Sequence, residues 1–300
     1  MRPGLAFLKA FLMPIQDWCC LKQTYITQMN LTKQFKAVSL CFMLLPPLHH
    51  KEGSQYKDVT EAAIGGARNI AMSCIKSGTV KKLIYTSSVV SASPLKEDGN
   101  GYKNFMDETL WTPLNLPLSH GSEFSSNYIS SKTLAEKEIL SYGENENGGG
   151  LQVVTLSVGL VGGEILLSST STLQSVSNLL SQVTDDAATY CLLRLLEDLT
   201  GKVPIVHVDD VCEAHIFCML NSSCNGRYLC ASSYVSSAEI ADYYVQNYPE
   251  FHVKQEFLDG PKREIKWAST KLIEEGFVYK YDTKMILDDC VKYARRMGYL

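Results

Sequence analysis

KLIYTSS, at residues 82–88, is a short apolar run that ends in three hydroxyl residues. A helical pattern precedes it over 58–77, another follows over 126–142, and a second apolar run, LQVVTLSV, occupies 151–158. Further upstream, the continuous apolar run AVSLCFMLL at 37–45 ends at two prolines. Unbroken apolar runs of this length are typical of strands buried on both faces, and strands that alternate with helices favour a parallel sheet. The chain is therefore predicted to be an α/β protein with a Rossmann-like parallel sheet.

The pattern changes in the C-terminal half, where the segments shorten and the helix and strand signals mix. A mixture of this kind favours a smaller α+β lobe that covers one end of the sheet. We expect helices near 172–182, 187–197, 237–247 and 283–296, and strands near 203–208 and 227–231.

The composition argues against several classes of function. Of the 300 residues, 45% are hydrophobic and 20% are charged, with a formal net charge of −4. Without a basic excess we expect no nucleic-acid partner and no polybasic membrane patch, and no stretch is long and charge-free enough for a membrane span. The ten cysteines form no CxxC pair, so we predict no metal site. Unpaired cysteines favour a reducing compartment, and we expect a cytoplasmic protein. Nothing in the pattern indicates an oligomeric state.

Two side chains of the predicted helix at 126–142 carry the strongest chemical signal. Tyr128 and Lys132 are four residues apart, which places both on one helix face. An ammonium group beside a phenol lowers the tyrosine pKa, so that the phenol can exchange a proton with a carbonyl oxygen near neutral pH. Thr86, Ser87 and Ser88 end a strand at the edge where open α/β sheets bind ligands. A non-catalytic interpretation is also open. With sixteen tyrosines in the chain, one Tyr/Lys pair at this spacing is expected by chance, and serines at strand ends often form hydrogen bonds with nearby backbone groups instead.

Several stretches, taken together and in order, resemble one family. IYTSSVVSASP (84–94), DETLWTPLNLPL (107–118) and YISSKTLAEKEIL (128–140) are similar to the plant dihydroflavonol and anthocyanidin reductases. That group belongs to the extended short-chain dehydrogenase/reductase family, also called the NAD-dependent epimerase/dehydratase family. PIVHVDDVCEAHIF (204–217) and NGRYLCAS (225–232) continue the similarity. The resemblance covers about residues 40–296.

The resemblance implies an NADP(H)-dependent oxidoreductase that reduces a flavonoid-like small molecule by hydride transfer. By position, Tyr128 is then the general acid, Lys132 tunes it and contacts the ribose, and Ser88 orients the substrate carbonyl. Ser87 stays open as a near-equivalent of Ser88, and Ser93 is the implied substrate contact. The implied cofactor contacts are Thr86, Ser87, Tyr128, Lys132, Val158 and Val161.

Three features depart from that family. The family opens with a strand and a Gly-rich turn that holds the pyrophosphate at a helix N-terminus, and nothing in residues 1–40 has this form. The cluster GLVGG at 159–163 follows a strand, but it lies mid-chain, and we interpret it as a loop beside the cofactor. Val158 stands where these reductases usually have a proline, which loosens the turn. Ser93 stands where dihydroflavonol reductases carry an asparagine. The serine favours an activity of the anthocyanidin reductase type over that of a dihydroflavonol reductase.

The same resemblance divides the chain into three parts. We predict an atypical N-terminal segment (1–36), a partial dinucleotide-binding Rossmann domain (37–165) that lacks its first strands, and a mainly substrate-binding lobe (166–300). Residues 203–217 are expected to return from this lobe to the sheet. Two alternatives stay open. One is a truncated, catalytically impaired paralogue or isoform that acts as a non-catalytic binding protein, and the other is a reductase of another carbonyl, such as a cinnamoyl derivative.

Overall fold

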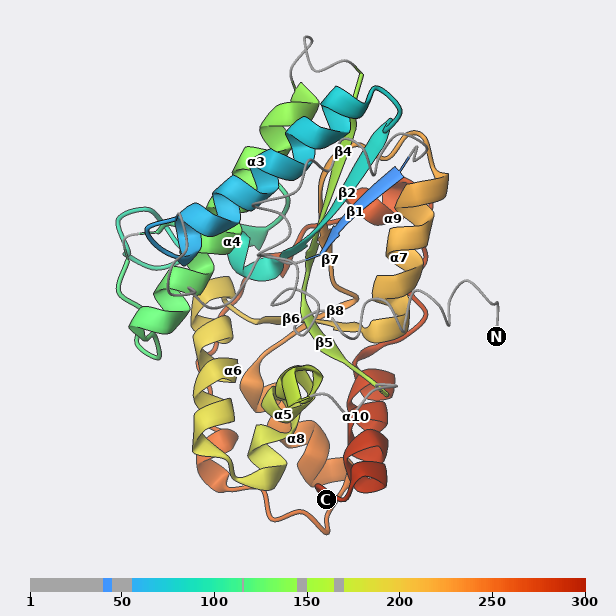
Figure 1. Cartoon of the computed structure of the whole chain (residues 1–300). Helices are drawn as coiled ribbons and strands as arrows, with labels where there is room; N and C mark the ends of the chain where they lie inside the picture. Colours follow the sequence, from blue (N-terminus) through green and yellow to red (C-terminus); the bar gives the residue numbers. More distant parts are fainter. Residues whose placement is uncertain (1–39, 45–55, 115, 145–149, 165–169) are drawn as a thin grey trace.

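A four-stranded parallel sheet forms the centre of the upper part of the molecule (Figure 1). The computed structural model describes residues 40–44, 56–114, 116–144, 150–164 and 170–300, so the predicted segment at 1–36 lies outside the described residues. The strands, in spatial order, are β1 (Leu40–Leu44), β2 (Lys82–Ser88), β4 (Gln152–Val158) and β7 (Gly226–Cys230). All three pairings are parallel, which confirms the predicted α/β class.

Helices cover both faces of this sheet. Figure 1 shows α3 (Val59–Ser77) and α4 (Glu123–Glu144) on the left and α7 (Val208–Leu220) and α9 (Lys271–Glu274) on the right. The buried face of α3 carries several small residues, including Ala63. These small side chains allow α3 to pack closely against α4 and the sheet. The apolar runs of β2 and β4 are buried between the two helical layers, as unalternating strands require.

The rest of the chain forms a second group of elements below the parallel sheet, which we call the lower lobe. Its sheet has three strands, and the four helices predicted for this half are present: α8 has the predicted bounds and the other three are longer than predicted. The lobe consists of β5 (Leu160–Gly162), β6 (Val203–His207), β8 (Ser233–Val235), α5 (Thr170–Thr184), α6 (Ala187–Thr200), α8 (Ser237–Asn247) and α10 (Thr283–Met297). Shorter elements are η2 (Val89–Ser91), β3 (Phe105–Met106), η3 (Gln255–Phe257) and β9 (Lys266–Trp267). None of the helices in the described ranges is long and apolar enough to cross a membrane.

One topological expectation needs correction. Strand β6, within the segment 203–217, does not join the parallel sheet but pairs with β5 in parallel and with β8 in antiparallel. The reason is that β5 follows β4 after a single residue and β8 follows β7 after two, so both strands continue beyond the sheet and offer β6 new partners. Helix α7 of the same segment does pack on the parallel sheet. The division of the chain into domains stays a prediction.

The glycine cluster at 159–163 proves to be a packing feature that contains strand β5, where we expected a loop. A Cβ atom on Gly159 would lie 2.7 Å from the Pro204 carbonyl oxygen. A Cβ on Gly162 would lie 2.5 Å from a methyl of Ile286. Gly163 has a φ of 105°, which favours glycine. It also has no room for a side chain, because a Cβ atom would lie 2.2 Å from Nε2 of His207. The glycines therefore let the β4–β5 connection press against β6 and α10.

Replacing Gly163 by alanine is expected to lower the free energy of unfolding by about 2 kcal/mol, because the backbone is in the left-handed region and the added methyl overlaps the His207 ring. Gly66→Ala is the matched control, since nothing lies within 4 Å of the added Cβ and the residue sits inside α3. That control is expected to stabilise the protein by about 0.5–1 kcal/mol. Urea unfolding of both variants measures the difference, and equal effects would contradict this account of Gly163.

Candidate active site

Helix α4 brings Tyr128 and Lys132 to the carboxyl end of strand β2. The Tyr128 hydroxyl shares a hydrogen bond with Ser88, the last residue of that strand. The Lys132 side chain is completely buried, and its Nζ lies 5.4 Å from the centroid of the Tyr128 ring. A phenol, an ammonium group and a hydroxyl thus meet at the edge where parallel sheets bind ligands.

The protonation of Tyr128 follows from its burial. Loss of solvent raises the pKa of Tyr128 above its ordinary value, and the hydrogen bond with Ser88 opposes this only in part. The sequence-based expectation was the reverse, a pKa lowered by Lys132, and it does not hold in this structure because desolvation of the phenol dominates. Tyr128 is accordingly a neutral phenol near neutral pH, which is the form that can donate a proton.

The two serines at the end of β2 point to different partners. Ser88 contacts Tyr128 and also accepts from the backbone N–H of Val90 at 3.5 Å. Ser87 is buried and donates to the carboxylate of Glu136 at 2.8 Å. The structure therefore places Ser88, and not Ser87, beside the tyrosine; the catalytic and cofactor roles of both stay predictions.

Thr86 is oriented by a buried histidine on α7. Its Oγ1 lies 2.7 Å from Nε2 of His215, and Nδ1 of that ring lies 2.7 Å from the carbonyl oxygen of Val211. Because a carbonyl only accepts, Nδ1 carries the proton, and Nε2 accepts from the threonine hydroxyl. Burial lowers the pKa of His215 to about 4, so the ring is neutral near pH 7. The Thr86 hydroxyl is thus used inside the protein, and its cofactor contact stays a prediction.

The remaining predicted residues lie on three different segments. Val158 ends β4 as the register partner of Ser88, at the same edge as Tyr128. Val161 lies in β5, opposite Val206. Ser93 is buried, where its hydroxyl donates to the Leu199 carbonyl and accepts from the Leu95 N–H at 3.1 Å. Contact of these side chains with cofactor or substrate stays a prediction.

A buried polar network beneath this site was missed by the sequence analysis. Its centre is Glu136, four residues beyond Lys132 on the same face of α4 and fully buried. The Glu136 carboxylate accepts hydrogen bonds from Ser87, Ser91, Thr155 and Ser157 and forms an ion pair with Arg227. Two signals pointed to it: a carboxylate that continues the i, i+4 series of Tyr128 and Lys132, and an arginine inside the apolar strand GRYLC, which needs a buried partner.

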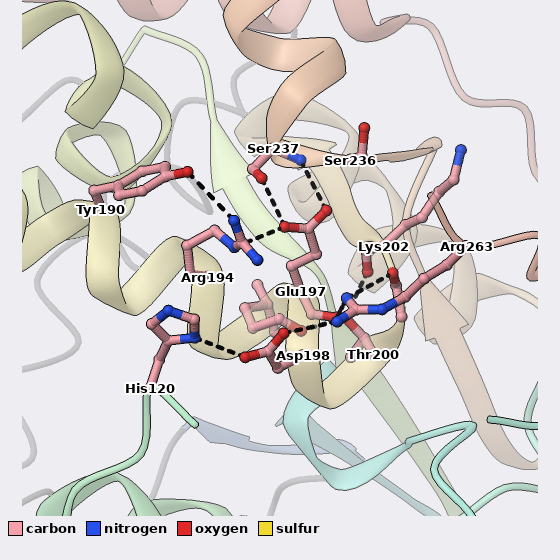
Figure 2. A network of polar contacts seen from close by, with 12 residues as sticks. His120, Tyr190, Arg194, Glu197, Asp198, Thr200, Lys202, Ser236, Ser237 and Arg263 are labelled. Carbon is pink, nitrogen blue, oxygen red and sulfur yellow. Dashed lines mark hydrogen bonds and ion pairs between the residues drawn. The ribbon is translucent and has the colours of Figure 1, made fainter. Parts of the chain in front are cut away.

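A second buried network lies in the lower lobe, at the C-terminal end of α6 (Figure 2). Glu197 accepts from the hydroxyl and the backbone N–H of Ser237 and pairs with Nε of Arg194 at 3.1 Å. The neighbouring Asp198 pairs with Nδ1 of His120 at 2.7 Å and with Arg263 at 2.8 Å. Asp198 thereby ties His120 and Arg263 to α6.

Comparison with known proteins gives concordant matches. The model of the NAD dependent epimerase/dehydratase family matches residues 47–231. Anthocyanidin reductase from Arabidopsis thaliana is 33% identical over 267 residues, which are 88% of this chain and 76% of that protein. Vestitone reductase from Medicago sativa is 32% identical over 248 residues, 81% of this chain and 70% of that protein.

Solved structures agree with these sequence matches. The crystal structure of vestitone reductase from alfalfa (Medicago sativa) superposes with a TM-score of 0.66 at 29% identity, covering 90% of this chain and 81% of that one. Yeast methylglyoxal/isovaleraldehyde reductase, complexed with NADPH, gives a TM-score of 0.66 at 18% identity, with 93% and 82% covered. The second likeness supports the fold alone.

Proposed function

This chain belongs to the NAD dependent epimerase/dehydratase family, and we propose that it is an NADP(H)-dependent reductase of a flavonoid-like substrate, of the anthocyanidin reductase type. The observation that carries the proposal is the meeting of Tyr128, Ser88 and the buried Lys132 at the carboxyl edge of the parallel sheet. Two relatives that match over most of the chain at more than 30% identity are named anthocyanidin reductase and vestitone reductase, which supports the substrate class.

The described residues fit the nicotinamide end of such a cofactor. A phenol, a buried ammonium group and strand-end hydroxyls form a set of donors suited to a ribose and a reacting carbonyl. In the proposal, Tyr128 and Lys132 hold the ribose, and residues 86–87, Val158 and Val161 line the remainder. When bound, the cofactor supplies a hydride to the substrate.

The side chains then divide the proton chemistry among them. Ser88 donates a hydrogen bond to the substrate oxygen and so orients it toward Tyr128. Tyr128, which burial keeps protonated, delivers its proton to that oxygen. The ammonium of Lys132 stabilises the phenolate that remains, because an opposite charge nearby favours the charged form.

Calorimetric titration of the full chain with NADPH, followed by assays of NADPH consumption, tests the proposal. Three substrates are compared: an anthocyanidin, a dihydroflavonol and a cinnamoyl aldehyde. A chimera with a family N-terminal segment that contains the Gly-rich turn is the matched control. Turnover of the anthocyanidin by the full chain supports the proposal, and turnover of the cinnamoyl aldehyde alone replaces it with another carbonyl reductase. Flavonoid binding with NADPH binding and turnover confined to the chimera would overturn it in favour of a non-catalytic binding protein.

A further inference from the structure

We propose that the buried ion pair of Glu136 and Arg227 is the positioning unit of the candidate active site. It holds helix α4, which carries Tyr128 and Lys132, at a set distance from the strand end that carries Ser88. The same pair anchors the loop that follows η2. This inference rests on the proposed function, since it concerns the alignment of the groups assigned there.

The Glu136 carboxylate is held by hydroxyl groups of two strands and of η2. One oxygen accepts from Ser87 at 2.8 Å, just before Ser88, and from Ser91, the last residue of η2. The other oxygen accepts from Thr155 and Ser157 of strand β4, both at 2.7 Å. A carboxylate offers about four lone-pair sites, so these contacts leave little freedom for it to turn. Helix α4 is thereby attached to the carboxyl ends of two neighbouring strands.

Arg227, on strand β7, adds a second set of contacts. Its Nε pairs with Glu136 at 3.1 Å, and its Nη2 donates to Ser91 at 3.1 Å. Its Nη1 donates to the carbonyl oxygens of Glu108 at 3.0 Å and Leu110 at 2.5 Å. The guanidinium also stacks on Trp111, 3.7 Å from the ring centroid. The rigid fork of an arginine therefore couples α4 to the 108–111 loop, which a single ammonium could not do.

A buried ion pair of this kind costs free energy of desolvation. Burying two charges is expensive, and an apolar pair of the same volume would often stabilise a fold equally well. Eight polar contacts converge on this pair, about one turn of helix from Lys132 and one residue from Ser88. Geometry at this point matters most to the reaction, because a misplacement of about 1 Å can lower a rate by about 10²-fold.

The lower lobe offers a matched control pair. Glu197 is also fully buried, also pairs with an arginine (Arg194) at 3.1 Å, and also accepts from a serine, Ser237 (Figure 2). Its carboxylate contacts Arg194 of α6 and Ser237 in the first turn of α8, its backbone carbonyl accepts from Arg263, and none of these partners belongs to the candidate active site. Glu197→Gln thus removes a comparable buried charge without touching Tyr128 or Ser88.

The experiment compares Glu136→Gln with Glu197→Gln in the full chain. Both variants should lower the thermal midpoint, since each leaves an arginine (the buried Arg227 or the partly buried Arg194) without its carboxylate partner. Glu136→Gln is expected to lower kcat by about 10- to 100-fold with KM and the NADPH dissociation constant changed by less than about threefold, whereas Glu197→Gln should keep kcat within about twofold. The double variant Glu136→Gln/Arg227→Gln should be no slower than the single one, because the two residues act as one unit. Arg227→Lys, which keeps the charge and loses the fork, is the second test if Glu136→Gln does not fold.

Equal kcat losses in the two glutamate variants, or a loss confined to KM, would overturn the inference. If the unmodified chain reduces none of the substrates, the proposed function fails, and amide hydrogen exchange then decides the positioning role separately. Exchange should rise at 87–91 and 128–132 in Glu136→Gln and stay unchanged there in Glu197→Gln. Unchanged exchange in both variants would show that Glu136 does not hold these segments.

Discussion

Replacing Tyr128 by phenylalanine should lower kcat by about 10²- to 10⁴-fold, the range that a positioned general acid contributes. The substitution removes only the hydroxyl that contacts Ser88, and the ring that lies beside Lys132 stays in place. Stability should therefore change little, and NADPH affinity should fall only by the single ribose contact that the hydroxyl supplies in the proposal, so most of the loss should fall on the chemical step.

Tyr142→Phe is the control for this experiment. Tyr142 lies on the same helix, about four turns closer to the C-terminal end than Tyr128. Its hydroxyl donates to Glu138 at 3.2 Å. Steady-state kinetics of both variants, with circular dichroism to confirm folding, measure the effect. A Tyr128→Phe enzyme that keeps the full kcat would remove this residue from the mechanism.

The role of Tyr128 as general acid also predicts how kcat/KM depends on pH in the alkaline range. A general acid must be protonated, and burial raises the pKa of Tyr128 above that of an ordinary phenol. We expect kcat/KM to hold through neutral pH and to fall only well into the alkaline range. A fall that begins near neutral pH would instead mean that Lys132 dominates, as we expected from the sequence.

Acid should destabilise the protein through His215, by about 2 kcal/mol between pH 7 and pH 5. The folded protein holds this ring neutral, with a pKa of about 4, because burial disfavours the charged form. The unfolded chain binds the proton near the ordinary pKa of 6.5. Between these two values the unfolded state binds more protons, so stability falls as the pH falls through 6.5 and levels off below about 4.

His215→Gln isolates this contribution, because glutamine does not titrate and its amide oxygen can still accept from Thr86. Urea unfolding at a series of pH values should show a shallower acid loss in this variant than in the parent. His252→Gln is the control, since that side chain is exposed. Parallel pH curves for the parent and His215→Gln would show that His215 is not the group responsible.

Much of the site follows from local pattern. Residues four apart on a helix share a face whatever the tertiary structure, so Tyr128 and Lys132 could be paired from their spacing. The hydroxyls of 86–88 could be placed at the ligand-binding edge because a parallel strand presents its carboxyl end there. The choice between Ser87 and Ser88 could not be made, because both side chains meet α4, and only the packing of that helix shows that Ser88 reaches Tyr128 while Ser87 reaches Glu136.

The sequence by itself determined the α/β class, the order of strands and helices up to β4, and the two residues that define the candidate chemistry. Those features depend on period, length and spacing along the chain. Only the tertiary structure decided that β6 leaves the parallel sheet, that Gly163 makes room for His207, and that Arg227 meets Glu136 across 91 residues. Each of these depends on which segments lie side by side and in which register, and desolvation of Tyr128 likewise depends on distant segments that no local pattern contains.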